Sequence, residues 1–383
     1  MKNSILCLPI TIPEKVKTGL VLTPFVVSAI SKLTGLASVC CVNLTGHRYK
    51  NLEINQIAQR FENFQKLLYR LDSTINHYWF DNNNSHANRL QTYCEKLATD
   101  GELKVENSQI FICQCGAVEV LKDSLHSDWS MDYKVLYWKN EKAFCALCDM
   151  PLEPKDEACL ILKSNFKKTN LNVLPLFYLK EIEKLRKDFN YPLLISRKKK
   201  GDRRISLFGK TWQLDTDFCW SLLFCSLIED GFYPSAVVIS NRSFKPLVWS
   251  LGISQKLFAN LKDTTVIVTP FVKFESDESQ HPNINNLKEL VDRYGRLPTK
   301  LLVASGLKWN QKEVIVNSNF IFWALKASDN KALISRPIDD ILSFPKIINT
   351  MDGNLINELI TNLRRETSVS LSPYQSLLIE RSI

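Results

Sequence analysis

The sequence predicts an α/β fold in which a parallel sheet is split by an insertion. Three observations support this prediction. Residues 4–12 and 37–44 are apolar runs with a helical segment between them, which is typical of the start of a parallel sheet. Two closely spaced cysteine pairs lie in a middle region of short strand-like pieces. Two further apolar runs, residues 235–239 and 265–271, follow and supply strands to the second half of the sheet.

The first hundred residues alternate strands and helices. Residues 24–32 are predicted to form a helix, and residues 53–70 repeat apolar side chains at helical spacing. The polar stretch 81–85, Asp-Asn-Asn-Asn-Ser, is predicted to cap a third helix that ends near Gly101. This order assigns residues 1–100 to the first half of the sheet domain.

The rest of the chain divides into three parts. Residues 101–175 are the predicted insertion, and residues 176–300 are the second half of the sheet domain. Residues 301–383 are predicted to be a short C-terminal part of mixed or helical structure. The helices predicted in these parts span about residues 176–189, 218–228, 287–294 and 356–363.

Composition excludes several classes of protein. Hydrophobic residues make up 45% of the 383 residues, so the chain can bury a core and is not disordered by composition. The net charge of +9 permits an anionic partner without requiring one. With 12 glycines and no glycine-rich phosphate motif, a loop that cradles phosphates is not expected.

The compartment follows from the apolar stretches and the cysteines. The longest apolar stretch, residues 20–30, is broken by Pro24 and is too short for a membrane span of about 20 residues. The 11 cysteines are odd in number, several lie in apolar runs, and no signal peptide precedes them. The sequence therefore predicts a cytoplasmic protein with reduced thiols and no membrane partner.

Two cysteine pairs form the sharpest local pattern. Cys113 and Cys115 make a CxC pair, and Cys145 and Cys148 make a CxxC pair. Four thiolates on two turns match the tetrahedral site that structural zinc prefers, and they leave no open position for catalysis. The pattern predicts a zinc knuckle as cofactor site. The alternative is that these are ordinary buried cysteines or a site that has lost its metal.

A basic segment begins at residue 197 and holds a single acid, Asp202. Such a segment can neutralise phosphates of a nucleic acid with salt-dependent affinity. The alternative is a solvated loop, which is the commoner fate of such runs. The residues predicted to contact nucleic acid are Lys198, Lys199, Lys200, Arg203 and Arg204.

A series of segments, in order along the chain, points to a protein family. The series comprises residues 35–46 (GLASVCCVNLTG), residues 71–103 with His86, Leu97 and Gly101, FICQCG with FCALCDMPLEP, Ile195-Ser196-Arg197, Leu214-Asp215-Thr216, and residues 283–295. Together it resembles the catalytic core of the class I aminoacyl-tRNA synthetases, in the methionyl, leucyl, isoleucyl and valyl subgroup. The resemblance implies a Rossmann-type core, a zinc-bearing connective insertion and an interaction with tRNA.

The sequence departs from that family at its two ATP-binding signatures. The HIGH signature is replaced by Lys17-Thr18-Gly19-Leu20, so both of the histidines that hold ATP phosphates are absent. The KMSKS position reads from Lys273 to Gln280 and contains three acids that would repel phosphate. These changes argue against ATP as a cofactor. Gly19 and Gly46 are the matching positions that the resemblance implies for binding a cofactor.

Three hypotheses follow for function. The first is a degenerate class I synthetase-like protein, without ATP-dependent aminoacylation, that binds tRNA or another RNA, an aminoacyl group or a protein partner. The second is an enzyme with a repurposed pocket, acting on aminoacyl-tRNA or activating an amino acid for a small-molecule pathway. His47 and Asp215 are its candidate catalytic residues. The third is a zinc-stabilised structural or interaction protein.

Overall fold

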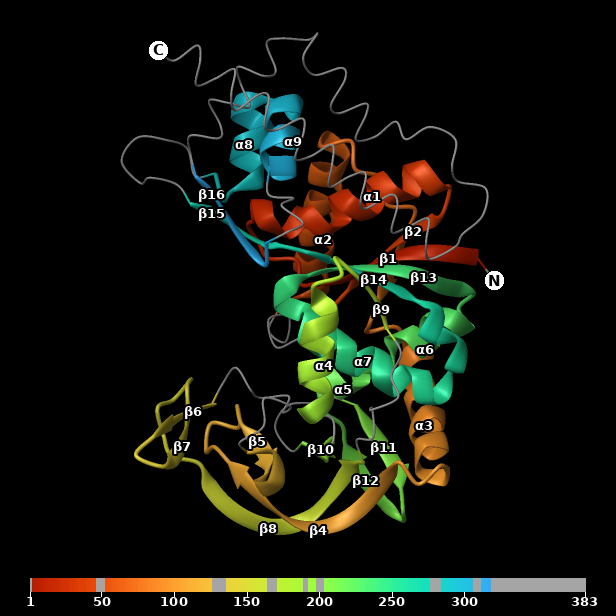
Figure 1. Cartoon of the computed structure of the whole chain (residues 1–383), viewed down its shortest axis with the longest axis vertical. Helices are drawn as coiled ribbons and strands as arrows, with labels where there is room; N and C mark the ends of the chain where they lie inside the picture. The colour runs from red at the N-terminus through yellow and green to blue at the C-terminus, as the bar shows by residue number, and fades with distance from the viewer. Residues whose placement is uncertain are drawn as a thin grey trace.

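The core is a parallel sheet of six described strands in the order β3-β2-β1-β13-β14-β9 (Figure 1). The computed structural model describes residues 2–45, 52–125, 136–163, 171–188, 192–197, 203–275, 284–305 and 311–317. The strands are β1 (Lys2–Ile10), β2 (Ala37–Val42), β3 (His77–Phe80), β13 (Phe232–Ser240), β14 (Thr265–Thr269) and β9 (Asn172–Leu174). The strand order reverses between β1 and β13, so the predicted Rossmann-type sheet split by an insertion is confirmed.

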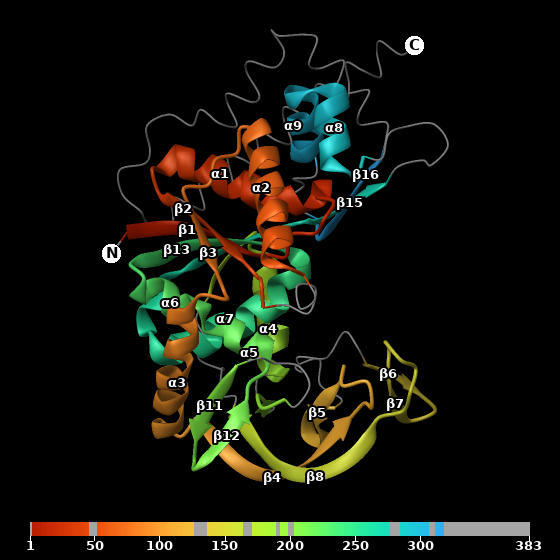
Figure 2. The ribbon, with the colours of Figure 1, turned by 180° about the vertical axis from the view of Figure 1, so that it is seen from behind.

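Helices cover both faces of this sheet (Figures 1 and 2). Side chains of β1 alternate, so that Ile5 and Cys7 join one buried cluster while Leu6 and Leu8 join the other. One face carries α1 (Leu22–Thr34), α2 (Ile54–Arg70), α8 (Leu287–Tyr294) and α9 (Arg296–Ser305). The other carries α3 (Asn84–Thr99), α4 (Tyr178–Asp188), α5 (Thr216–Ser221), α6 (Leu223–Glu229) and α7 (Phe244–Leu257). Because both faces are buried, the strands are continuous apolar runs.

Capping residues and a glycine define the ends of three helices. The Glu53 side chain accepts from the backbone of Gln56, whose own side chain accepts from Glu53, so a capping box begins α2. Asn83 caps α3 by accepting from the backbone N–H of Ser85 at 3.0 Å. Gly295 ends α8 with φ of 80°, a conformation that glycine adopts without strain.

The insertion forms an antiparallel sheet in the order β10-β8-β4-β5 (Figure 1). Where short pieces were expected, β4 (Leu103–Ile112) and β8 (Glu153–Leu162) run for 10 residues each and pair along their whole length. The first half of β8 is exposed and charged, so it has no apolar run to mark it as a strand. The edge strands are β5 (Glu119–Leu121) and β10 (Leu193–Leu194).

The two sheets interleave along the chain. Strand β9 lies inside residues 101–175 but joins the parallel sheet, and β10 follows it but joins the antiparallel sheet. The division of the chain at residue 175 remains a prediction. The helix predicted over residues 218–228 is broken at Leu222 into α5 and α6.

Three two-stranded elements complete the described chain. They are β6 (Leu136–Lys139) with β7 (Lys142–Cys145), β11 (Arg204–Leu207) with β12 (Lys210–Gln213), and β15 (Phe271–Glu275) with β16 (Glu313–Asn317). Pro270 separates β14 from β15, which were predicted as one strand, because proline cannot donate to a ladder. The helix predicted over residues 356–363 lies outside the described residues. Within the described part, no helix combines the length and the apolar character needed to cross a bilayer.

Candidate functional site

A cavity of about 590 Å³ opens at the carboxyl ends of β1, β13 and β14. This is where the strand order reverses, which is the usual ligand position in open parallel sheets. Its charged lining residues are Lys17, Arg242 and Lys273, and no aspartate or glutamate is among the described residues that line it. Hydroxyl groups of Thr11, Thr23, Ser240, Ser243 and Thr269 belong to residues of the same wall.

The three cations come from separate loops and strands. Arg242 lies just after β13, and its guanidinium carbon is 4.0 Å from the centroid of the Phe271 ring. Lys273 projects from β15, and its Nζ lies 3.9 Å from an oxygen of Glu313, with both side chains about half exposed. Lys17 is exposed at the entry to the first helical turn. Such a cavity favours an anionic group, because its cations outnumber nearby acids.

Gly19 lies in the wall of this cavity, in the 3-10 turn η1 (Thr18–Val21). A Cβ at this position would lie 3.0 Å from the Val272 carbonyl oxygen, so glycine lets the main chain of β15 approach. The Thr18 hydroxyl donates to the Ile284 carbonyl at 2.6 Å and fastens the turn from its other side. Cofactor binding by Gly19 remains a prediction, and Gly46 lies outside the described residues.

Asp215 is the buried N-cap of α5. Its carboxylate accepts from the backbone N–H groups of Asp217 at 2.7 Å and Phe218 at 3.2 Å. Its other oxygen lies 3.1 Å from a nitrogen of the buried Arg197. The same guanidinium donates to the Ala117 carbonyl at 3.3 Å and lies 3.5 Å from Glu119. The carboxylate thus joins α5 to the insertion, and Asp215 is not among the residues that line the cavity.

The catalytic role of Asp215 remains a prediction, and its partner candidate His47 lies outside the described residues. The segments Ile195-Ser196-Arg197 and Leu214-Asp215-Thr216 lie side by side in the structure, because the Asp215 backbone N–H donates to the Ile195 carbonyl at 2.9 Å. This contact places the Ile-Ser-Arg segment beside the start of α5, as two parts of one structural junction.

The basic segment divides in the structure. Arg203 is half-buried, and its charge adds to the effect of burial that lowers the pKa of His86 to about 4. Its charge also acts on Asp81, although burial raises the pKa of that carboxyl. Arg204 is exposed on β11. Lys198, Lys199 and Lys200 lie outside the described residues, and nucleic-acid contact by all five remains a prediction.

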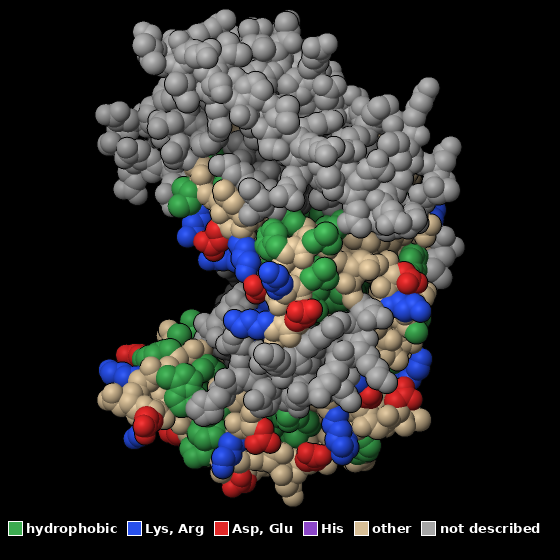
Figure 3. Space-filling view, viewed as in Figure 1, with side chains coloured by type: hydrophobic (Ala, Val, Ile, Leu, Met, Phe, Trp, Pro, Cys, Tyr) green, Lys and Arg blue, Asp and Glu red, His purple; other side chains and the backbone are tan. Residues whose placement is uncertain are grey.

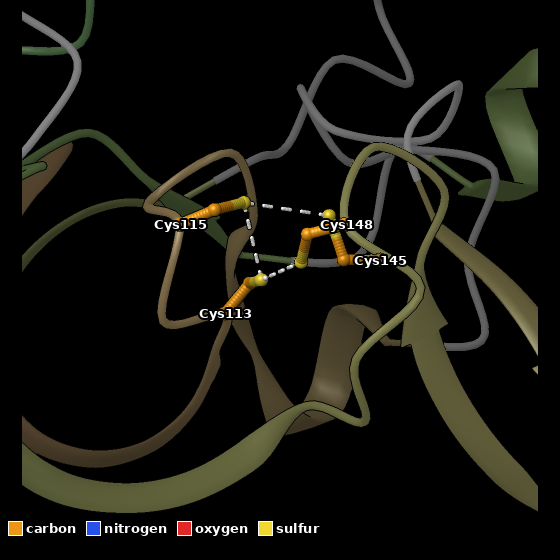
Figure 4. Close-up of side chains that lie close together, drawn as sticks. All are labelled: Cys113, Cys115, Cys145 and Cys148. Carbon is orange, nitrogen blue, oxygen red and sulfur yellow. Dashed lines mark hydrogen bonds between the residues drawn. The ribbon is translucent and has the colours of Figure 1, made fainter.

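The four predicted metal ligands meet at the tip of the insertion (Figure 4). All four sulfurs lie within 4.8 Å of one another, and Cys113 Sγ is 3.2 Å from Cys115 Sγ and 3.0 Å from Cys148 Sγ. Cys115 Sγ is 3.7 Å from Cys145 Sγ. A zinc tetrahedron with bonds of about 2.3 Å needs sulfurs about 3.8 Å apart, so small adjustments fit the metal.

Two turns bring these sulfurs together. Gly116 and Asp149 each follow the second cysteine of a pair, and each has positive φ, 73° and 57°. The backbone N–H of Ala117 lowers the pKa of Cys115 to about 7, whereas burial raises the pKa of Cys113. A thiol that is readily deprotonated favours capture of a metal ion. The donor set fits a structural zinc ion.

A hollow separates this tip from the parallel-sheet domain (Figure 3). Lysine and arginine side chains, with a few acids, gather along its upper wall on the face shown.

Two residues of interest were not predicted from the sequence. Arg242 was missed, although its place immediately after a buried strand was a usable signal. The buried contact of His86 Nδ1 with Ser226 Oγ, at 2.7 Å, had no local signal because 140 residues separate the partners.

The fold is similar to that of solved structures of methionyl-tRNA synthetase. Methionyl-tRNA synthetase of Mycobacterium tuberculosis bound by methionyl-adenylate matches with a TM-score of 0.63 and 8% identity, over 98% of this chain and 84% of that chain. A second structure in complex with methionyl-adenylate matches with a TM-score of 0.63 and 10% identity, over 96% and 81%. The apo form matches with a TM-score of 0.62 and 9% identity, over 97% and 79%.

No protein-family model and no curated protein matches the sequence. At identities this low, the structural likeness shows the fold alone. The fold of the core is like that of a class I synthetase, as the order of the sequence motifs predicted.

Proposed function

We propose that the protein is a class I synthetase-like protein that binds tRNA and does not charge it with ATP. The ligand proposed for the cavity is the 3′-terminal aminoacyl-adenosine of an aminoacyl-tRNA. The observation that supports this best is the cavity at the strand-order reversal, with Lys17, Arg242 and Lys273 around it and no acid among its described lining residues. A structurally similar synthetase is bound by methionyl-adenylate, which is also an aminoacyl nucleotide.

The chemistry of the wall suits such a ligand. An aminoacyl nucleotide has a phosphate, a ribose and two less polar ends, the base and the amino-acid side chain. The cations can neutralise the phosphate, and hydroxyls such as those of Thr23 and Ser243 can bond to the ribose. Leu8, Ile10 and Phe274 provide apolar wall. A cavity of about 590 Å³ lies within the usual range of small-molecule sites, roughly 300–1,000 Å³.

Side chains at the first signature support the proposed absence of charging. Lys17 and Leu20 line the cavity at the positions that resemble the two signature histidines. The isobutyl group of Leu20 has no donor for a phosphate oxygen, so stabilisation of the adenylation transition state is lost at that position. Binding a ready-made aminoacyl ester requires only ground-state complementarity, which the remaining cations can provide.

A structural zinc ion is part of the proposal. Cys113, Cys115, Cys145 and Cys148 would hold it, and the metal would lock the two turns that they occupy. The Arg197 contact with Ala117 would then fasten the metal-bound tip to α5. Arg203, Arg204 and the three lysines 198–200 remain proposed contacts for the RNA outside the cavity.

Binding of unfractionated tRNA tests the proposal, measured at about 50 and 200 mM salt. The wild type is expected to bind with strong salt dependence. Replacing Lys17, Arg242 and Lys273 together by Gln should lower the log–log salt slope by about two, because each phosphate contact on a single strand contributes about 0.7. A matched triple variant at exposed lysines away from the cavity, Lys66→Gln, Lys184→Gln and Lys262→Gln, controls for net charge.

A charging assay with ATP, tRNA and all amino acids completes the test. No aminoacyl-tRNA is expected to form. Charging of any tRNA would contradict the proposed loss of aminoacylation. Absence of tRNA binding by the wild type would contradict the proposed function and favour the zinc-stabilised interaction protein. The repurposed enzyme remains a prediction, because neither of its candidate residues is described as part of the cavity.

A further inference from the structure

The hairpin of β11 and β12 ends in a two-residue turn, Phe208-Gly209. Leu207 pairs with Lys210 across it, and the turn residues have φ of 53° and 72°. Turns of this kind require positive φ at both positions, which Asn, Asp and Gly supply readily. A bulky residue in this conformation is uncommon. Phe208 is nevertheless 55% exposed, so neither the turn nor the core explains an aromatic side chain here.

The rest of the hairpin is held firmly. The Gln91 side chain on α3 donates to the Ser206 carbonyl at 2.8 Å and accepts from the Ser206 N–H at 2.9 Å. The buried Trp212 indole donates to the Leu207 carbonyl at 3.0 Å. Ile205 and Leu207 point into the main hydrophobic cluster. Phe208 is therefore presented from a rigid platform that lies along α3 (Figure 2).

The hairpin itself carries only basic charges, and the nearby carboxylate of Glu95 on α3 accepts from the Gln91 amide that also bonds to Ser206. Arg204 and Lys210 are both exposed on the hairpin, and no acidic residue occurs from 203 to 214. Lys210 Nζ lies 4.4 Å from the centroid of the Trp212 ring, which orients its ammonium group on the hairpin. The register places these two cations on opposite faces of the hairpin, Arg204 opposite Gln213 and Lys210 opposite Leu207. An exposed aromatic ring at the end of such a basic hairpin matches the surface that binds single-stranded nucleic acid, where bases stack and phosphates are neutralised.

We infer that the β11–β12 hairpin binds an unpaired nucleotide of RNA, with Phe208 stacked on the base and Arg204 and Lys210 beside the adjoining phosphates. A protein partner would need a broader apolar surface than one exposed ring on a basic hairpin. That the RNA is tRNA rests on the proposed function. Stacking on an unpaired base does not, and it can be measured separately.

Binding of two probes by the full-length protein tests this inference: a single-stranded oligoadenylate and unfractionated tRNA. Phe208→Ala is expected to weaken oligoadenylate binding roughly 5- to 100-fold, the usual effect of removing one stacking ring. Phe208→Trp should bind as the wild type does. Arg204→Gln and Lys210→Gln should each lower the log–log salt slope by about one.

Phe208→Gly separates a role in binding from a role in folding. Glycine adopts positive φ without strain, so this variant should melt at the wild-type temperature or higher while losing as much affinity as Phe208→Ala. Ile54→Ala is the matched control, because Ile54 is 84% exposed on α2, and it should leave binding unchanged. A lower melting temperature of Phe208→Gly, or an equal loss of binding in Ile54→Ala, would overturn the inference.

The remaining outcomes distinguish the two proposals. If Phe208→Ala binds both probes as the wild type does while the cavity triple variant loses tRNA, the hairpin inference fails and the proposed function stands. If oligoadenylate binding depends on Phe208 while tRNA binding ignores the cavity cations, the hairpin inference stands and the proposed function fails. A wild type that binds neither probe overturns both and leaves a protein partner as the explanation for Phe208.

Discussion

The cysteine cluster and the cavity at the reversal of strand order depend on different features of the chain. The cluster retains every ligand atom, since four sulfurs from two turns lie within 4.8 Å of one another. The cavity lies at the reversal of strand order, and Lys17 and Leu20 line it at the positions where the sequence resemblance implies histidines. A metal site depends on particular donors, whereas the strand topology makes a cavity whatever side chains line it. Substitutions are therefore expected to act differently in the two regions.

The largest expected effect is at the cysteine cluster. Cys113→Ser should abolish bound zinc and destabilise the tip of the insertion by several kcal/mol, because metal binding contributes directly to the stability of such small modules. Metal analysis of the purified protein should give one zinc per chain for the wild type and none for the variant.

Cys225→Ala is the control for this substitution, since Cys225 is buried outside the cluster. It should keep the zinc while losing some packing energy. Unchanged thermal unfolding of Cys113→Ser would place the cluster with the ordinary buried cysteines and remove the contrast with the cavity.

The second effect concerns the junction between the two regions. Asp215→Asn keeps a capping residue on α5 but leaves the buried Arg197 without a carboxylate from that side. A loss of about 3–5 kcal/mol in the free energy of unfolding is expected, measured by urea denaturation. Arg242→Gln in the cavity should change that free energy by less than about 0.5 kcal/mol. If Asp215→Asn unfolds like the wild type but loses an enzymatic activity that the wild type has, the catalytic role predicted for Asp215 would be favoured instead.

The third effect is a dependence of stability on pH. Burial lowers the pKa of His86 to about 4, from an ordinary value of 6.5. Between these values the unfolded chain binds a proton that the folded chain does not, so stability falls as pH drops from about 6.5 to about 4. The total is about 3 kcal/mol. Unfolding of the wild type and of His86→Gln across this range should show a flatter curve for the variant. Parallel curves would show that His86 does not contribute this term.

The smallest effects are expected at single cations of the cavity. Lys17→Gln and Arg242→Gln should each weaken tRNA binding a few-fold and lower its log–log salt slope by about one, with melting unchanged. Filter binding over a salt series measures both quantities. An unaltered slope in both variants would show that the cavity does not contact phosphates.

The sequence predicted what depends on nearby residues. The cap of α3 within residues 81–85, the end of α8 at Gly295 and the cysteine pairs all act over a few positions. The features that the sequence did not predict depend on contacts between residues that are far apart in the chain. Arg242 becomes part of a cavity only when β1, β13 and β14 are adjacent, and His86 meets Ser226 only across the packed helices.

Strand β8 was hard to recognise for a related reason. Its first half is solvent-exposed and charged, and only pairing with β4 over its whole length makes it a strand. Propensity is a weak guide for such a segment, because the partner strand and not the local sequence supplies the stabilising hydrogen bonds.

Protection of the tRNA 3′ end tests the central claim most directly. Aminoacyl-tRNA labelled at its 5′ end would be digested with a single-strand-specific nuclease, with wild-type protein or with the variant in which Lys17, Arg242 and Lys273 are Gln. The wild type is expected to protect the terminal unpaired nucleotides, whereas the variant, at a concentration that still binds the RNA, is expected to leave them open to cleavage. Equal cleavage of the 3′ end with and without wild-type protein, at saturation, would contradict binding of the 3′ end in the cavity.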